Sequence, residues 1–169
     1  MSRNRRSGGI LNRRPRGPLL WAFRLPVVLF RMGAGAVFGR RLIYLVHLGR
    51  HTGRRRDTVL EVVDYDPTGP EVFVVSARGP QSDWFLNLQS SGALEVRLGS
   101  QHWSRPEHRV LPPDETLRLL QRYRRRHPFL WQALSPLLTA PRHPDADAWT
   151  ALANRLTAVA LRPVSPPAR

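Results

Sequence analysis

The sequence predicts an α+β domain or a partly open β-barrel. The chain has 169 residues, a length typical of one domain with one substantial core. Five or six short runs rich in β-branched and aromatic residues are separated by turn signals, and the helical segments do not alternate regularly with them. We therefore expect a strand-rich domain with small interspersed helices, and not a doubly wound sheet.

The first 40 residues are expected to precede the main domain. Residues 1–17 are rich in Arg, Gly and Pro and predict a disordered basic arm. Residues 18–40 predict an amphipathic N-terminal helix region, in which Arg24 and Arg31 lie on a face of their own. The two arginines argue against a membrane span. Two alternatives stay open, a cleaved signal peptide and an interfacial helix that meets anionic lipid.

The central third of the chain predicts a series of strands. Apolar runs at 42–48, 58–63 and 72–75 have the composition of strands. The last two are separated by Asp-Pro-Thr-Gly at 66–69, in which Pro presets φ and Gly supplies a positive φ. We expect these two strands to form a hairpin.

A short helix and two more strands follow. Ser82 is expected to cap a helix over 82–88, whose apolar side chains recur at helical spacing. Strands are expected at 94–98 and at 102–111. Because proline cannot donate to a strand ladder, Pro106 predicts that the second is an edge strand or is broken there.

The last third predicts mainly helix. A helix begins after Pro112 with acids at its start and arginines at its end, as the helix dipole favours. An apolar segment at 129–138 and an Asp-capped helix at 145–155 lead to a final strand at 156–161. The helix that begins after Pro112 is expected to bury Leu117, Leu120 and Tyr123. The main domain is accordingly expected to span residues 41–163, with a tail at 164–169.

The composition excludes several kinds of chemistry. All 27 basic residues are arginine, so that the formal charge is +15 and no lysine exists for a Schiff base or a phosphate-binding P-loop. The absence of cysteine excludes disulfides, thiolate nucleophiles and Cys-ligated metals. Residues 1–56 hold 14 of the arginines and no acid. Nearly all the excess charge is therefore in the first third of the chain.

The strongest candidate binding site is the loop GRHTGRRR at 49–56. Its two glycines let the chain turn and direct amides outward, and Thr52 adds a hydroxyl. Four arginines and His51 supply donors that suit phosphate or carboxylate. The alternative is an ordinary solvated basic hairpin. Four neighbouring arginines repel one another, and an ordinary hairpin does not need them. We therefore favour an anion-binding site.

No protein-borne reactive centre is evident beside this loop. His47 and His51 are four residues apart, but they lack the companion residues of a metal site, and we predict no metal ligands. No Walker motif, dinucleotide fingerprint or G-x-S-x-G elbow occurs. A site that offers anion binding without a nucleophile indicates that a cofactor carries the chemistry.

Three runs in order, GRHTGRRRDTVLEVV, VFVVSARG and SDWFLNLQSSGALEVRLG, resemble the deazaflavin-dependent nitroreductase family, which binds coenzyme F420. The resemblance is good over residues 42–99. It implies a split β-barrel like that of flavin-reductase and FMN-binding proteins, with an N-terminal helix and small peripheral helices. Coenzyme F420 is the implied cofactor, with FMN as the alternative.

The resemblance also implies roles for particular residues. Those expected to bind the phosphate and oligoglutamate tail are Arg50, His51, Thr52 and Arg56. Those expected to lie beneath, beside or across from the deazaflavin ring are Asp57, Thr58, Val59, Ser76, Ala77, Trp84, Phe85 and Asn87. His51 stands where the family usually has lysine, which replaces a permanent charge by a titratable one. The substrate-side tyrosines of some members are replaced by the segment 129–131. No catalytic residue is assigned.

These inferences lead to two functional hypotheses. The first is an enzyme that transfers a hydride from reduced F420 to an apolar acceptor, which would be quinone-like, nitroaromatic or lipid-like, near Trp84 and the segment 129–131. The second is a non-enzymatic basic module that binds F420 or flavin, an anionic membrane or nucleic acid. Nucleic acid is the least favoured partner, because no recognition helix or aromatic platform is evident. We expect a cytoplasmic protein, and two alternatives stay open: a peripheral position at the inner face of the membrane through residues 1–41, and a homodimer.

Overall fold

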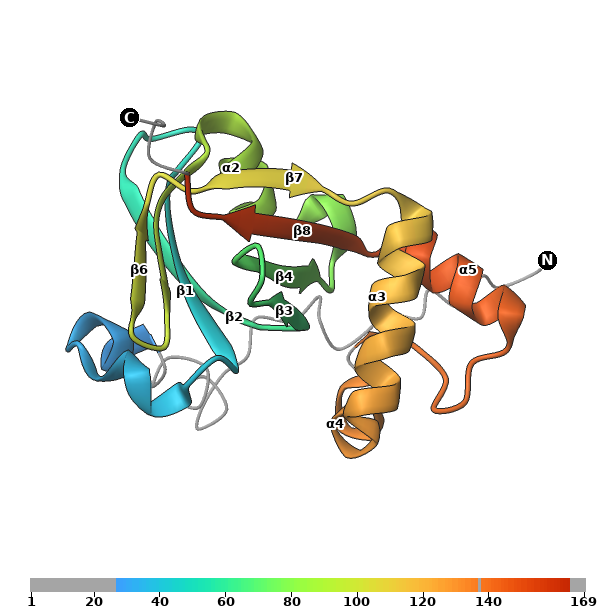
Figure 1. Ribbon diagram of the computed structural model, residues 1–169. Coiled ribbons are helices and arrows are strands. Elements are labelled where there is room, and N and C mark those ends of the chain that lie inside the picture. Colours follow the sequence, from blue (N-terminus) through green and yellow to red (C-terminus); the bar gives the residue numbers. More distant parts are fainter. Residues whose placement is uncertain (1–26, 137, 165–169) are drawn as a thin grey trace, which may run out of the picture.

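The computed structural model describes residues 27–136 and 138–164 (Figure 1). The predicted basic arm at 1–17, residues 18–26 of the predicted N-terminal helix region and residues 165–169 lie outside the described residues. Residues 27–31 are helical, and the 3-10 helix η2 spans Ala34–Phe38. No helix in the described part of the chain is long and apolar enough to cross a membrane.

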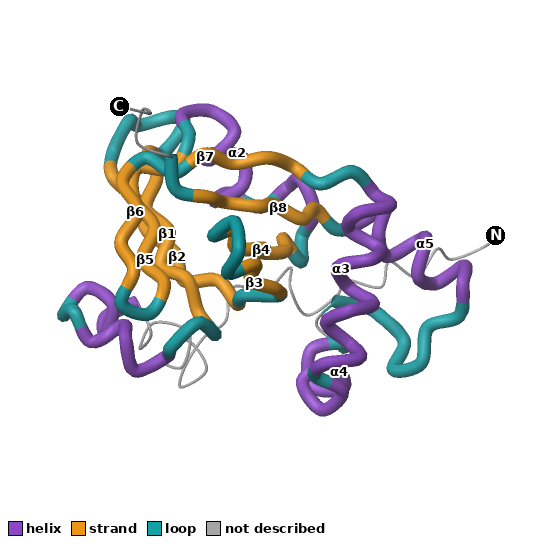
Figure 2. The backbone as a smooth tube through the Cα atoms, in the orientation of Figure 1, coloured by secondary structure: helices purple, strands orange, loops and turns teal. Residues whose placement is uncertain are grey.

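The strands form two antiparallel sheets of four strands each (Figure 2). The first sheet has the order β2, β1, β5, β6 and the second has the order β3, β4, β8, β7. The strands of the first are β1 (Leu42–Leu48), β2 (Arg55–Glu61), β5 (Ala93–Leu98) and β6 (Gln101–Ser104). Those of the second are β3 (Asp64–Asp66), β4 (Glu71–Ser76), β7 (Glu107–Val110) and β8 (Thr157–Arg162). No ladder closes the sheets into a barrel within the described residues.

The main core lies between the two sheets. Side chains of a strand alternate between its faces, so that Ile43 and Leu45 of β1 meet Val72 and Val74 of β4. The opposite face of the second sheet is also buried, because Ala158 and Ala160 of β8 pack with Leu119. Double burial explains why β8 is apolar almost throughout.

Helices cover the second sheet and one end of the core (Figure 1). Helix α2 (Asp83–Ser91) places Phe85 and Leu88 in the core between the sheets. Helices α3 (Pro113–Arg126), α4 (Pro128–Leu134) and α5 (Ala146–Arg155) form a separate cluster around two tryptophans in tilted ring contact, Trp131 and Trp149. The prediction of a buried face on α3 is confirmed for Leu120 and Tyr123, while Leu117 is only partly buried and Leu119 is fully buried.

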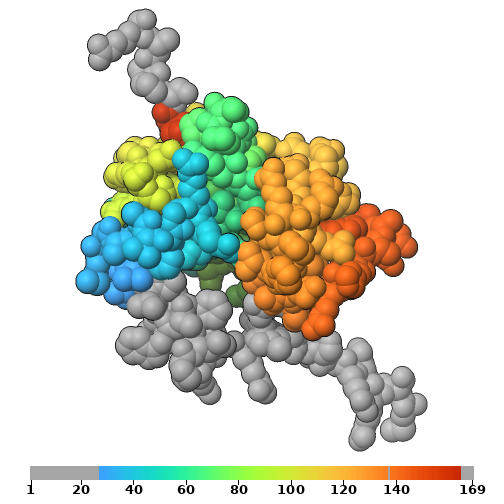
Figure 3. Space-filling view, turned by 60° about the horizontal axis from the view of Figure 1, so that its bottom comes forward, coloured from blue at the N-terminus to red at the C-terminus, as the bar shows by residue number. Residues whose placement is uncertain are grey.

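The N-terminal segment covers the outer face of the first sheet. Phe30 is 1% exposed and stacks between Phe38 and Tyr44, with ring centroids 5.6 Å and 5.5 Å away. Figure 3 shows this segment, from residue 27 onward in blue, on the opposite side of the molecule from the orange α3–α5 region. The segment is therefore an integral layer of the fold and not a free appendage.

The structure corrects the predicted hairpin between 58–63 and 72–75. Strand β2 pairs with β1, from Leu42 opposite Glu61 to Leu48 opposite Arg55. The turn after Asp66 joins the short strand β3 to β4 instead. The prediction missed this because β3 is only three residues long, and a turn signal does not specify how far the preceding strand extends.

Two other local predictions have clear outcomes. The strand at 102–111 is broken at Arg105 and Pro106, as proline indicated, and its halves join different sheets as β6 and β7. Ser82 does occupy the N-cap position of α2, but its hydroxyl makes no capping hydrogen bond. That hydroxyl contacts Ser76 instead.

Candidate functional site

A cleft of about 830 Å³ lies where the loop between β1 and β2 faces α2 and the end of β4. Of the site residues expected from the sequence, those that line it are Arg50, His51, Thr52, Arg56, Asp57, Thr58, Ala77, Trp84 and Asn87. These residues come from segments up to 37 positions apart, as the Arg50 to Asn87 contact illustrates. The fold thus brings most of the expected site together.

Three expected residues do not line the cleft. Phe85 is 7% exposed and packs in the core between the sheets. Ser76 is 1% exposed, and its hydroxyl donates to the carbonyl of Gly79 at 2.6 Å. Val59 lies opposite Tyr44 and packs in the cluster with Phe30. All three support the walls of the cleft from behind.

The alternation of β2 divides its residues between two faces. Arg56, Thr58 and Leu60 line the cleft. Asp57 also borders the cleft, but its carboxylate is bound on the opposite face by Arg31 and Tyr44. The hydrogen bond from Arg31 lowers the pKa of Asp57, although burial opposes the shift. Asp57 is therefore ionised, and Arg31 compensates its negative charge behind the site.

The amides of the loop do not point outward as the sequence suggested. The N–H of Gly49 donates to Arg54 O at 2.8 Å, and the N–H groups of Thr52 and Gly53 donate to Gly49 O at 3.1 Å and 2.7 Å. The N–H of Arg50 donates to Asn87 Oδ1 at 3.0 Å. A short loop that closes on itself uses its own amides, so the side chains remain as anion donors.

The four arginines of the loop do not act as one cluster. Arg50 and Arg56 line the cleft, whereas Arg55 donates to Glu95 Oε2 at 2.5 Å, and Arg54 is exposed and does not line it. Arg55 and Arg56 are adjacent in β2 and must therefore face opposite sides of the sheet. Neither Arg54 nor Arg55 therefore adds its charge to the cleft beside His51.

Arg50 bridges the loop to α2. Its guanidinium donates to Asp83 Oδ1 at 3.1 Å and to Asn87 Oδ1 at 3.2 Å. Asn87 is 7% exposed. Its amide oxygen accepts hydrogen bonds from both the backbone N–H and the guanidinium of Arg50. This residue positions the loop, a role that the sequence did not suggest.

The segment after β4 forms another wall of the cleft. Ser76 Oγ lies 2.5 Å from Ser82 Oγ, and this contact holds the two ends of the turn together. Gly79 has φ +57°, and a Cβ there would lie 2.3 Å from the carbonyl oxygen of Arg155. The turn is thus held against the end of α5, and it presents Ala77 and Arg78 to the cleft.

Several lining residues were not expected from the sequence, among them His47, Leu60, Val75 and Arg78. Arg78 directly follows the expected Ala77, so the signal was present in the run VFVVSARG. His47 was considered only as a metal ligand. Within the described residues no cluster of His, Asp and Glu suits a metal ion.

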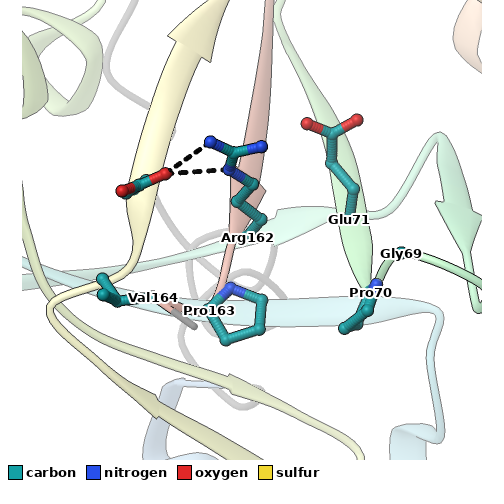
Figure 4. A pocket seen from close by; sticks show the side chains of 7 residues that line it. Gly69, Pro70, Glu71, Arg162, Pro163 and Val164 are labelled. Carbon is teal, nitrogen blue, oxygen red and sulfur yellow. Dashed lines mark hydrogen bonds and ion pairs between the residues drawn. The ribbon is translucent and has the colours of Figure 1, made fainter. Parts of the chain in front are cut away.

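A second cleft of about 480 Å³ lies at the far end of β8 (Figure 4). Its charged residues are Glu71, Glu107 and Arg162. Arg162 is paired with Glu107 at 2.7 Å, and Glu71 accepts from Arg109. Because two carboxylates and one neutralised arginine line it, this cleft is poorly suited to an anion, and the first cleft is the candidate site.

The fold and the first cleft together define a class, an α+β domain whose cleft combines arginine side chains with apolar walls. A family model described as F420H(2)-dependent quinone reductase matches residues 26–133, and the chain belongs to this family. It is therefore an oxidoreductase that depends on coenzyme F420. The resemblance noted from the sequence motifs is confirmed.

Comparison with solved structures found several distant likenesses. A structure described as an F420-H2 dependent reductase, FDR-A, is 14% identical, with a TM-score of 0.46 over 73% of this chain and 96% of that chain. A domain-swapped dimer is also 14% identical, with a TM-score of 0.48 over 86% and 100%. An FMN-binding protein related to pyridoxamine 5'-phosphate oxidase, from Nostoc punctiforme, is 14% identical with a TM-score of 0.42 over 88% and 82%. The search of curated proteins found no match.

The side chains of the cleft fit an anionic, ring-bearing cofactor. Arg56 and Arg78 form no ion pair within the described part of the chain, so their guanidinium groups are available to phosphate or carboxylate. Leu60, Val75 and Trp84 supply apolar surface for a ring system. The donor set thus agrees with the F420 dependence of the family.

Proposed function

We propose that coenzyme F420 binds in the cleft between the β1–β2 loop, the turn after β4 and helix α2. The observation that supports this most directly is the juxtaposition of Arg56 and Arg78, two arginines that pair with no acid of the described residues, with the apolar residues Leu60 and Val75 in one cleft. Arg56, Arg78 and the Thr52 hydroxyl would hold the anionic part of the cofactor. Arg50 and His51 border the same region.

The cofactor in its reduced form supplies the hydride, and the protein supplies orientation and electrostatics. Ala77, Thr58 and Trp84 would contact the ring, since they line the cleft from three different elements. Phe85, Ser76 and Val59 would act from behind by keeping these walls in place. Asp57 would help by holding Arg31 against the back of β2.

We propose a quinone-like molecule as the acceptor, in line with the description of the family. An apolar acceptor agrees with the apolar part of the lining and with Trp84. The segment 129–131, once expected beside the acceptor, does not line this cleft. Phe129 is 84% exposed, and Trp131 is 1% exposed within the helical cluster. The acceptor is therefore assigned to the Trp84 side alone.

Cofactor binding can be tested by titrating F420 while following tryptophan fluorescence. Arg56→Gln and Arg78→Gln should each weaken binding by about tenfold, because a hydrogen bond to a charged group contributes about 1.5–3 kcal/mol. Arg125→Gln is the matched control, since it removes an exposed arginine of α3 outside the cleft. An absence of saturable quenching, or equal affinities in all three variants, would contradict the proposed site.

A peripheral membrane contact is a second, compatible proposal. Val28, Met32 and Val37 are exposed by 45%, 75% and 82% on the N-terminal segment, near Arg40 and Arg41. Exposed apolar side chains beside arginines suit the surface of an anionic bilayer. Co-sedimentation with phosphatidylglycerol vesicles should fall when Met32 and Val37 are replaced by serine. Unchanged sedimentation of this variant would contradict the contact.

Homodimer formation also remains a prediction. Light scattering coupled to size-exclusion chromatography measures the mass directly, against 19.3 kDa for one chain. A mass near that of a single chain at micromolar concentration would contradict it.

A further inference from the structure

His47 is the most deeply buried ionisable side chain of the cleft. It is 3% exposed and nevertheless lines the cleft at the end of β1. The pairing of β1 with β5 shifts between Val46 and His47, so that a β-bulge adjoins this side chain. Bulges commonly re-aim a side chain beside a functional site. The neighbouring Leu45 belongs to the core, whereas His47 borders the cleft.

The contacts of the ring define which nitrogen is free. Nδ1 lies 3.4 Å from the carbonyl oxygen of Leu48, which favours a proton on Nδ1. Nε2 has no hydrogen-bond partner within the described residues, although every fully buried polar side-chain atom there is satisfied. Nε2 is thus not fully enclosed by protein. It is the nitrogen that can meet a molecule in the cleft.

The charged groups around His47 come from β2, β5, the β1–β2 loop, the turn after β4 and α2. Arg56 of β2 lies directly opposite in the strand register, and Asp57 follows it. Glu95 is two residues beyond Ala93, the partner of His47 in β5. Both carboxylates are already bound, Asp57 by Arg31 and Glu95 by Arg55 and Arg97. The remaining charged or titratable residues of the cleft are Arg50 and His51 of the loop, Arg78 of the turn after β4 and Asp83 of α2.

This environment favours the neutral form of His47 while the cleft holds no anion. Burial lowers the pKa of His47, and the positive charge of Arg56 adds to the effect, although the Leu48 carbonyl and Asp57 oppose it. An anion bound at Arg56 would offset that positive charge and add a negative one. Both changes favour the protonated imidazole.

We infer that His47 is a proton-linked contact for the anionic part of the cofactor. When a phosphate or carboxylate group binds beside Arg56, Nε2 takes up a proton from solvent and donates a hydrogen bond to that group. The inference rests on the proposed binding site. It adds to that site a residue, His47, that donates a hydrogen bond to the anionic group only when its imidazole is protonated. By linkage, cofactor affinity must then rise as the pH falls.

The first test measures cofactor binding by tryptophan fluorescence from pH 5.5 to pH 8.5. In the wild type the Kd should fall with decreasing pH, by at most about tenfold per pH unit for one proton. In His47→Gln, which cannot titrate, this part of the pH dependence should be lost. A titration of the cofactor itself would be common to both proteins. His143→Gln is the control, because that side chain is exposed and lies outside the cleft.

The second test counts directly the protons that are taken up on binding. Its result does not depend on whether a variant has lost stability. Calorimetric titration in buffers of different ionisation enthalpy should show proton uptake on binding in wild type and in His51→Gln, and less uptake in His47→Gln and His47→Asn. If the uptake disappears in His51→Gln and persists in the His47 variants, the inference is overturned. The same titration with a form of the cofactor that lacks the glutamate tail tells phosphate from carboxylate. If proton uptake persists with this form, the group that His47 contacts is the phosphate.

A readout on proteins that retain His47 covers the case in which the His47 variants do not fold. The ring signal of His47, in a chain with 13C-labelled histidines, should titrate at a higher pH with cofactor than without. It can be assigned by elimination from single substitutions of the other five histidines. An unchanged titration of His47 with saturable binding overturns this inference alone. An absence of binding at every pH would instead overturn the proposed site.

Discussion

Arg31 and Asp57 form a two-pronged ion pair, in which Nε and Nη2 of the arginine each donate to one carboxylate oxygen at 2.6 Å. Tyr44 donates a third hydrogen bond to Oδ2 at 2.7 Å. Asp57 is the residue after Arg56, so the pair ties the N-terminal segment to the back of the strand that borders the cleft. The cleft and the N-terminal layer are therefore mechanically connected.

Arg31→Met should destabilise the protein and weaken cofactor binding. The side chain of Asp57 is only 14% exposed, and a buried carboxylate that loses a charged partner costs about 1–3 kcal/mol. The carboxylate would also add uncompensated negative charge behind Arg56, which lowers the affinity for an anion. Urea denaturation and F420 titration measure the two effects. Arg118→Met is the control, because its pair with Asp114 is exposed on both sides. Equal stability of the two variants would contradict this role of Arg31.

The stabilisation by Asp57 should depend on pH in a defined direction. The hydrogen bond from Arg31 lowers the pKa of Asp57 in the folded protein, so the folded state favours the ionised form. The resulting stability is fully present above the unfolded pKa, at about pH 4, and is lost as the pH falls through the lower folded pKa. The difference in unfolding free energy between wild type and Arg31→Met should therefore shrink below pH 4. A difference that stays constant from pH 7 to pH 2.5 would contradict the assignment.

Gly35→Ala should loosen the N-terminal layer. A Cβ at this position would lie 2.1 Å from Phe30 Cδ1, and the ring cannot easily move because it is 1% exposed and stacked on both sides. Overpacking of this kind typically costs about 1–3 kcal/mol. Gly69→Ala is the matched control, since no atom lies within 4 Å of its added Cβ. The comparison is made by thermal unfolding, and similar melting temperatures of the two variants would argue against a rigid N-terminal layer.

Gly79→Ala should disturb the wall of the cleft that carries Ala77 and Arg78. Both Gly79 and Gly33 have a positive φ, +57° and +81°, so alanine strains the backbone at either position by about 1–2 kcal/mol. Only at Gly79 does the Cβ also approach backbone, 2.3 Å from Arg155 O. We expect Gly79→Ala to lose more stability than Gly33→Ala and to weaken F420 binding. If the two variants lose equal stability, the close approach to the end of α5 is not tight in solution.

Much of the secondary structure followed from local patterns. The limits of β1 and the Asp145-capped helix α5 agree with the expectation, because strand composition and side-chain capping act within a few residues. The break at Pro106 was likewise a local consequence of a missing donor. The hairpin assigned to 58–63 failed, because the partner of a strand is chosen by distant segments.

By itself, the sequence determined the α+β class, the choice of the loop at 49–56 as the candidate binding site and the family resemblance, since composition, spacing and motif order are local properties of the chain. The tertiary structure decided which arginines face the cleft, since Arg55 and Arg56 point to opposite sides of a strand whose inner face is defined only by its packing. It also decided the pairing of Arg31 with Asp57 and the burial of His47 beside the cleft. These contacts depend on long-range packing, which brings together groups that no sequence pattern relates.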